Sequence, residues 1–110
     1  MLSSILHFWY NRGYGIMLSE RPIKIEKIGK KFTDREILRL AIIAELDAVS
    51  LYEQLAESTE NKAIREVLLD VAKEEKTHVG EFQTLLLRED KEQVEELEHG
   101  KEEVEKELGL

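Results

Sequence analysis

The sequence predicts an all-α protein: an antiparallel hairpin of two long helices, followed by a short C-terminal helix. Three observations lead to this prediction. The 110 residues include one Pro and six Gly, which leaves few turn residues for a many-stranded sheet. Apolar residues recur at helical spacing from about residue 33 onward. Pairs of capping residues stand where the first and third helices would begin.

The first helix is expected to begin after Thr33. Thr33 and Glu36 have the spacing of a capping box, in which each side chain accepts a hydrogen bond from the other residue's free backbone amide. From Ile37 to Leu55, apolar residues cover far more than one stripe of the helix, which predicts burial on several sides. Ser58 to Asn61 then supply polar residues for a short turn.

A second helix is predicted from the turn to about Glu89, and it runs antiparallel to the first because the connection is short. Asp90 and Gln93 form a second capping pair, which starts a third helix rich in Lys and Glu. Gly100 is expected to kink or split that helix. Residues 32–110 are therefore interpreted as one helical domain.

Residues 1–31 are interpreted as a separate, flexible N-terminal extension. They hold six Lys or Arg against two Glu, whereas the rest of the chain holds ten against 22 acidic residues. Ile23, Ile25 and Ile28 alternate among lysines, over too few residues for more than a short strand or an extended arm. Met17 is a candidate natural start, because the aromatic stretch before it differs in character from the residues after it.

The composition excludes several kinds of site. The chain has no Cys, so disulfides, thiolate metal sites and iron–sulfur clusters are excluded, and any metal must bind carboxylates and imidazoles. A formal net charge of −8 predicts attraction for cations and no binding of nucleic acid. No apolar stretch approaches the roughly 18 residues of a membrane span, and the apolar start lacks the features of a signal peptide. We therefore expect a cytoplasmic protein without membrane contact.

Each long helix has a seam of core-facing residues, and metal-binding side chains interrupt both seams. In the first helix, spacings of three and four select Leu38, Ala41, Glu45, Ala48, Tyr52 and Leu55. In the second helix, they select Ile64, Leu68, Val71, Glu75, His78, Phe82 and Leu85. In a hairpin that turns near residues 59 and 60, Glu45 and Glu75 lie at the same height.

Glu45, Glu75 and His78 therefore form the candidate metal site. Buried carboxylates at one level need positive charge between them, since an isolated one is costly or stays protonated. A two-fold axis would double the three residues to four Glu and two His, the ligand set of carboxylate-bridged di-iron and di-manganese bundles. This donor set suits iron, with manganese as the less favoured alternative.

The same residues have a simpler interpretation, a buried salt-bridge cluster that fixes the register of a non-catalytic assembly module. Glu-x-x-His is a weak motif in so Glu-rich a chain, and Glu96 with His99 repeats it in a charged stretch where we expect solvated surface. Asp47 and Glu74 are candidate secondary ligands. Tyr52 either hydrogen-bonds a ligand carboxylate or fills the core.

Burial of the hairpin requires further copies of the chain, because two helices cannot enclose a core alone. The first helix is nonetheless apolar nearly all round. A homodimer that joins two hairpins into a four-helix bundle is the smallest solution, and larger rings meet the same requirement.

At these residues the chain resembles the encapsulated ferritins, a ferritin-like, rubrerythrin-like family with half-length subunits. Two segments carry the resemblance: IIAELDAVSLYEQ, from Ile42 to Gln54, and VAKEEKTHVGEF, from Val71 to Phe82. The resemblance covers about residues 34–90. Leu51 and Ala44 depart from the residues of some members, which have a Trp and a further Glu there.

The resemblance implies a ferritin-like four-helix bundle with a ferroxidase site between two chains. By position, Glu45, Glu75 and His78 match the family's iron ligands. Tyr52 matches a tyrosine near the centre, and Asp47 matches a carboxylate near a secondary iron site. Members of the family form rings, commonly decamers of five dimers, and are often cargo of a protein shell called encapsulin.

We therefore expect an iron oxidase for iron storage or detoxification, in which oxygen or peroxide oxidises two Fe(II) ions to Fe(III). Glu45 would bridge or chelate, Glu75 would bridge and His78 would cap each metal. A rubrerythrin-like peroxide reductase would use the same site with an electron donor, whereas an assembly module would bind no stoichiometric iron. Gly100 to Leu110 contain no clear targeting peptide, so encapsulation stays open.

Overall fold

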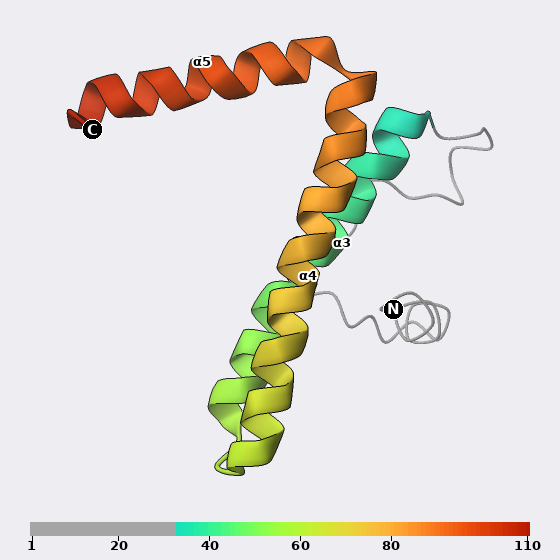
Figure 1. Ribbon diagram of the computed structural model, residues 1–110, viewed down its shortest axis with the longest axis vertical. Coiled ribbons are helices and arrows are strands. Elements are labelled where there is room, and N and C mark those ends of the chain that lie inside the picture. The colour runs from blue at the N-terminus through green and yellow to red at the C-terminus, as the bar shows by residue number, and fades with distance from the viewer. Residues whose placement is uncertain (1–32) are drawn as a thin grey trace, which may run out of the picture.

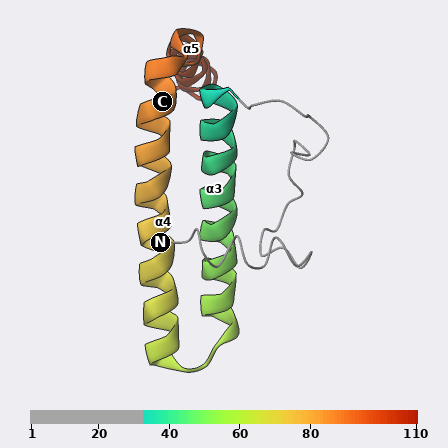
Figure 2. The same cartoon turned by 90° about the vertical axis from the view of Figure 1, so that its right-hand side faces the viewer.

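The computed structural model describes residues 33–110, which form three α-helices: α3 (Asp34–Ser58), α4 (Lys62–Glu89) and α5 (Lys91–Leu108). α3 and α4 lie side by side and run antiparallel, while α5 leaves the end of α4 at a sharp bend (Figures 1 and 2). No strand occurs within residues 33–110, so the predicted all-α hairpin with a C-terminal helix is confirmed. The extension predicted for residues 1–31 lies outside the described residues. None of the described helices is both long enough and apolar enough to cross a membrane.

The first turn of α3 is held by the predicted capping box. The backbone N–H of Glu36 donates to Thr33 Oγ1 at 3.3 Å, and the backbone N–H of Thr33 donates to Glu36 Oε2 at 3.1 Å. Two of the amides that a helix start leaves free are thereby satisfied. The box fixes where the hairpin begins and hence the height of every later residue on α3.

Arg65 joins the two ends of the hairpin turn. Asn61 caps α4 by accepting a hydrogen bond from the backbone N–H of Ile64 at 3.1 Å. One turn further, the Arg65 guanidinium donates to the carbonyl oxygens of Ala56 and Thr59, at the end of α3. These carbonyls have no partner within α3's own helical ladder. The turn is therefore short and well bonded, as the polar residues after the first helix predict.

The bend between α4 and α5 is built on Asp90. Its Oδ1 accepts a hydrogen bond from the backbone N–H of Gln93 at 3.1 Å, which confirms the predicted cap of α5. Its Oδ2 lies 2.9 Å from the Arg39 guanidinium on α3. α5 therefore meets α4 at the bend and is tied to α3 only through this ion pair at its cap.

α5 continues through Gly100 as one helix from Lys91 to Leu108, so the prediction that Gly100 splits it is wrong. A Gly in a helix interior costs about 1 kcal/mol relative to Ala. This cost is too small to end the helix, because the neighbouring turns stabilise it. The His99 ring nitrogens lie 3.3 Å from carboxylates one turn away on either side, Glu96 and Glu103. Gly109, with a φ of 69°, closes the helix through a bond from its backbone N–H to the Glu105 carbonyl.

The core of a single chain is thin and consists mostly of small residues. The buried apolar residues within the described part are Ala48, Val49, Ala56, Ala72 and Leu86. The ends of the predicted seams stay open, since Leu55, Ile64 and Leu85 are 43%, 50% and 50% exposed. The prediction that these three residues lie in the core is wrong for a single hairpin, because each of the two helices covers only one face of the other.

Candidate metal centre

Glu45, Glu75 and His78 meet at mid-height between α3 and α4. Each residue offers one ligand atom, and these atoms all lie within 4.8 Å of one another. No other group of three or more acidic, His or Cys residues in positions 33–110 meets that condition. The register expected from the turn position therefore brings together the three residues that the seams single out.

The imidazole of His78 lies between the two carboxylates. Its Nδ1 is 3.4 Å from Glu45 Oε2 and 3.4 Å from Glu75 Oε2. One ring nitrogen carries at most one hydrogen, so it cannot satisfy both oxygens at once. Of the two contacts, the one to Glu75 has hydrogen-bond geometry.

Glu45 Oε2 is left buried and without a hydrogen-bond partner among the described residues. Glu45 is 8% exposed and Glu75 is 3% exposed, so water screens their charges poorly. A buried acceptor with no donor costs about 1–3 kcal/mol, and a charged one costs more. The three residues thus include a buried carboxylate oxygen that their own contacts do not satisfy, which is the condition that a bound cation relieves.

The donor set fits a first-row transition metal. Two carboxylates with one imidazole match the hard and borderline ligands that iron and manganese take in proteins. Ala48 and Ala72 lie one turn from the two glutamates and are buried. Because alanines take little room on the facing sides, both carboxylate side chains fit between the helices.

The flanking candidates stand apart from the three. Tyr52 is half-buried and makes no hydrogen bond to Glu45, Glu75 or His78 in the described structure. Asp47 is half-buried and Glu74 is exposed, and neither belongs to the group. The geometry thus brings Glu45, Glu75 and His78 into one compact group to which these three neighbours do not belong.

The second Glu-x-x-His, on α5, lies on the surface. The side chains of Glu96 and His99 are 63% and 61% exposed, so their expected place in solvated surface is confirmed. Although their contact distance resembles that of Glu75 and His78, they lack a third ligand within reach of the same point.

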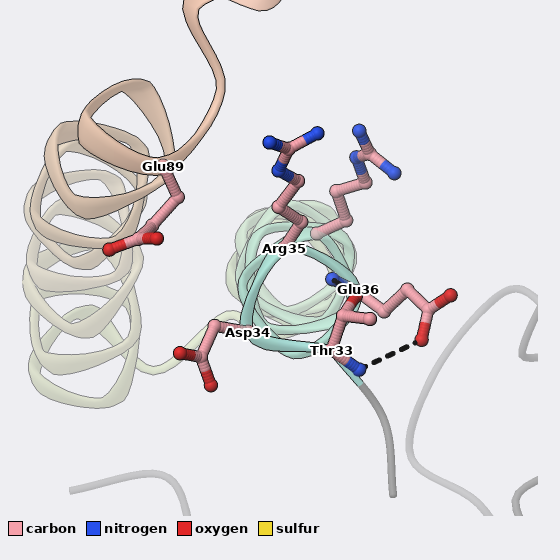
Figure 3. Close-up of a pocket in the computed structure, with 6 residues that line it drawn as sticks. Thr33, Asp34, Arg35, Glu36 and Glu89 are labelled. Carbon is pink, nitrogen blue, oxygen red and sulfur yellow. Dashed lines mark hydrogen bonds between the residues drawn. The ribbon is translucent and has the colours of Figure 1, made fainter.

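A hollow of about 430 Å³ lies elsewhere, at the start of α3 (Figure 3). Its lining residues are Thr33, Asp34, Arg35, Glu36, Arg39 and Glu89. Beside it, the hydrogen bond from the Gln93 backbone N–H, together with the Arg39 guanidinium, holds the pKa of Asp90 below its ordinary value of 3.8. The sequence identified Asp90 as a cap but gave no sign of Arg39, which lies 51 residues away.

An antiparallel hairpin with one Glu on its first helix and a Glu-x-x-His on its second defines a protein of the ferritin-like helical class. The comparison with protein families agrees, because the model described as Rubrerythrin matches residues 36–109. The chain belongs to the rubrerythrin family.

Individual relatives confirm the resemblance to the encapsulated ferritins. A ferritin-like–encapsulin shell fusion protein of Pyrococcus furiosus is 56% identical over 97 residues, which cover 86% of this chain and 28% of that protein. The encapsulin nanocompartment cargo protein EncC of Myxococcus xanthus is 40% identical over 82 residues, which cover 72% of this chain and 61% of EncC. The chain thus spans less than two thirds of either curated relative.

A solved structure matches most of the chain. The crystal structure of the encapsulated ferritin domain from Pyrococcus furiosus aligns with a TM-score of 0.70 at 54% sequence identity. The alignment covers 84% of this chain and 97% of that one. The described helices therefore correspond to a ferritin-like domain rather than to a fragment of an unrelated coiled coil.

Proposed function

We propose that this protein is a ferroxidase that oxidises Fe(II) to Fe(III) at a di-iron site formed between two chains. The observation that carries the proposal is the group of Glu45, Glu75 and His78, in which both carboxylates are buried and one carboxylate oxygen has no partner among the described residues. Iron is the substrate, and manganese is the less favoured ion. Each of two Fe(II) ions gives up one electron, and oxygen or peroxide accepts them.

Each of the three residues has a distinct part in binding iron. Glu45 would bridge or chelate iron through the oxygen that otherwise has no partner, Glu75 would bridge, and His78 would cap one metal through its imidazole. The low exposure of both carboxylates keeps competing water away and holds their oxygens in place before iron arrives. The acidic body of the chain attracts Fe(II) to the site.

Two chains are needed because the part of one chain that the structure describes brings three ligand side chains together. Large apolar residues on the hairpin, including Ile37, Leu46 and Val67, are about half exposed or more. A second hairpin related by a two-fold axis would cover such residues and double the ligand set to four Glu and two His. We propose this homodimer as the unit of a larger ring, with the decamer as the expected size.

The neighbouring residues would have secondary parts. Tyr52 is proposed to orient a ligand carboxylate once iron and the second chain are in place. Asp47 and Glu74 are proposed as ligands on the path by which iron enters. All three roles are separate from the binding of the two metals by Glu45, Glu75 and His78.

The names of the relatives support a location inside a protein shell, and we propose that this shell lies in the cytoplasm. One relative is a fusion of a ferritin-like part with an encapsulin shell, and another is an encapsulin cargo protein. We propose that this chain also acts beside an encapsulin shell, where Fe(III) would be mineralised. Detection of the chain in the shell-particle fraction of a sedimented cell extract would support this, and its recovery only as free oligomers would contradict it.

The family match favours one alternative, a rubrerythrin-like peroxide reductase at the same site. Such an enzyme turns over only with a supply of electrons. Because the chain has no Cys, a rubredoxin-type centre would have to come from another protein. Sustained consumption of peroxide with an added electron donor would identify the reductase, whereas a ferroxidase would stop once its Fe(II) is exhausted.

The test is an anaerobic titration with Fe(II), followed by air, with the oligomeric mass measured in parallel. The ferroxidase proposal predicts saturation at about one iron per chain and rapid oxidation. Glu45→Ala, Glu75→Ala and His78→Ala should each abolish both, while circular dichroism shows unchanged helix content.

Glu96→Ala and His99→Ala are the matched controls, since they remove the same residue types from the exposed Glu-x-x-His of α5. They should oxidise iron at the wild-type rate. Absence of stoichiometric binding, or equally slow oxidation in every variant, would reject the ferroxidase and leave the non-catalytic assembly module.

A further inference from the structure

α5 is joined to the hairpin at one end. No residue of α5 is buried, and no Cα atom of α5 lies within 8 Å of a Cα atom of α3. Beyond the bend, the helix projects away from the hairpin (Figure 1). Its 18 residues span about 27 Å, so a rotation of about 20° at the bend would move the far end by roughly 9 Å. The bend therefore decides where α5 points.

The bend consists of one non-helical residue, Asp90. Its φ of −141° and ψ of 89° separate Glu89, the last residue of α4, from Lys91, the first residue of α5. Rotation about the N–Cα bond of Asp90 would swing α5 as a unit, because the Asp90 carbonyl moves with the helix and keeps its bond from the Val94 amide. The direction of α5 thus depends on an angle that no helical hydrogen bond fixes.

The side chain of Asp90 opposes this rotation. It is attached to the same Cα atom as the carbonyl, so it turns with α5, and its Oδ1 also accepts the hydrogen bond from the Gln93 amide. Its Oδ2 lies 2.9 Å from the guanidinium of Arg39, which stands on α3 across the bend. A swing of α5 would pull Oδ2 away from Arg39. Since the Asp90 side chain is 8% exposed, its carboxylate would lose this partner with little water to replace it.

A fixed direction matters when chains assemble. Large apolar residues of α5 are between 45% and 67% exposed, namely Val94, Leu97, Val104 and Leu108, so the helix offers apolar surface to another chain. A part that is already held in its bound position loses less conformational entropy on binding than a part that swings. One direction in every chain also gives the repeated angle that a closed ring requires.

We propose that Arg39 is a positioning residue for assembly: through Asp90, it holds α5 in the direction in which a further copy of this chain binds. The proposal rests on the assembly of several chains that is part of the proposed function. It uses none of the iron ligands, so it can be tested without iron oxidation.

The direction of α5 is measured first, within single chains. The chain has no Cys, so Lys73→Cys on α4 and Glu102→Cys on α5, both at exposed positions, take spin labels at those two sites alone. Labelled chains are unfolded, mixed with an excess of unlabelled chains and refolded, so that each labelled pair lies in one chain. Double electron–electron resonance should give one narrow distance distribution in the wild-type background. Arg39→Met should broaden it.

Further variants separate positioning from a general loss of charge. Arg39→Lys keeps the positive charge and should keep the narrow distribution. Arg88→Met is the matched control, because Arg88 lies in the last turn of α4, is exposed, and makes no hydrogen bond or ion pair with any residue in positions 33–110. In an Asp90→Asn background, Arg39→Met should add no further broadening, since the two residues act as one pair.

Assembly is then measured on the same variants by native mass spectrometry. The wild type and Arg88→Met should give a single oligomer mass. Arg39→Met should give several masses and should need about fivefold more protein for half assembly. Circular dichroism should show unchanged helix content, because the Arg39 side chain is 50% exposed.

Two results would overturn the proposal. One is an unchanged distance distribution in Arg39→Met. The other is a broader distribution with unchanged masses and an unchanged assembly midpoint, since α5 would then bind another chain without a fixed direction. If both the distance distribution and the masses change in a protein that does not oxidise Fe(II), this proposal stands while the ferroxidase is rejected.

Discussion

The Arg39 guanidinium lies 2.9 Å from Asp90 Oδ2, although the two residues are 51 positions apart. The other oxygen of the same carboxylate accepts a hydrogen bond from the backbone N–H of Gln93 and so caps α5. Asp90 is only 6% exposed. One buried carboxylate therefore fixes both the start of the third helix and its attachment to the first.

Removal of this carboxylate should destabilise α5 more than it destabilises the hairpin of α3 and α4. In Asp90→Ala, the Gln93 amide loses its acceptor and Arg39 loses its partner. We expect faster hydrogen exchange in the first turn of α5 and a lower urea midpoint for the whole chain. Asp90→Asn keeps an acceptor for the amide and should have a smaller effect. Glu102→Ala, at an exposed position in the middle of α5, is the control and should change neither quantity.

The contribution of Asp90 should depend on pH with a definite sign. The hydrogen bond from Gln93 and the nearby Arg39 lower the pKa of the folded state below 3.8, so the unfolded chain takes up a proton first as the pH falls. The stabilisation is present above the unfolded pKa and is lost as the pH drops through the folded pKa. The difference in urea midpoint between wild type and Asp90→Asn should stay constant from about pH 6 to about pH 4, then shrink. A difference that grows below pH 4 would contradict this assignment.

The metal-free protein should gain stability when Glu45 becomes apolar. Glu45→Leu removes the buried oxygen that has no partner and leaves the contact of Glu75 with His78 in place. We expect an increase of about 1–3 kcal/mol in the free energy of unfolding, measured in the presence of a chelator. Added Fe(II), under anaerobic conditions, should stabilise wild type but not the variant. A variant less stable than wild type without metal would show that the carboxylate has a partner in solution. Glu66→Leu is the control, because it makes the same change at an exposed position of α4.

Gly100→Ala should stabilise α5. A Cβ atom at this position would meet nothing within 4 Å, and Ala is favoured over Gly in a helix interior by about 0.5–1 kcal/mol. Slower exchange of the α5 amides, together with a higher urea midpoint, would check this. A loss of stability would indicate that another surface approaches the helix closely at this glycine.

Local signals predicted the helix boundaries well. Thr33 with Glu36, and Asp90 with Gln93, make the expected caps because capping depends on residues only three apart. The position of the turn then placed Glu45 and Glu75 at one level, since helical rise fixes height once the turn is known. Features that depend on one helix and one turn are therefore present in the sequence.

Features that depend on packing between residues far apart in the sequence could not be predicted from the sequence in this way. Arg39 finds Asp90 only because the folded hairpin brings the start of α3 beside the end of α4. The seams predicted Leu55 and Leu85 as core, whereas the adjacent Ala56 and Leu86 are the buried residues. A spacing of three and four selects a face of each helix but does not say which edge of that face meets the neighbouring helix and which meets another chain. Gly100 shows the same limit, because a local propensity of about 1 kcal/mol does not decide the course of a whole helix.

The small core of the single chain has a thermodynamic consequence. Three of the five buried apolar residues within positions 33–110 are alanines, so little apolar surface would be exposed if one hairpin unfolded by itself. The heat capacity change of that step is correspondingly small. Most of the heat capacity change of the functional protein would then come from contacts between chains, and its melting temperature would rise with the concentration of subunits.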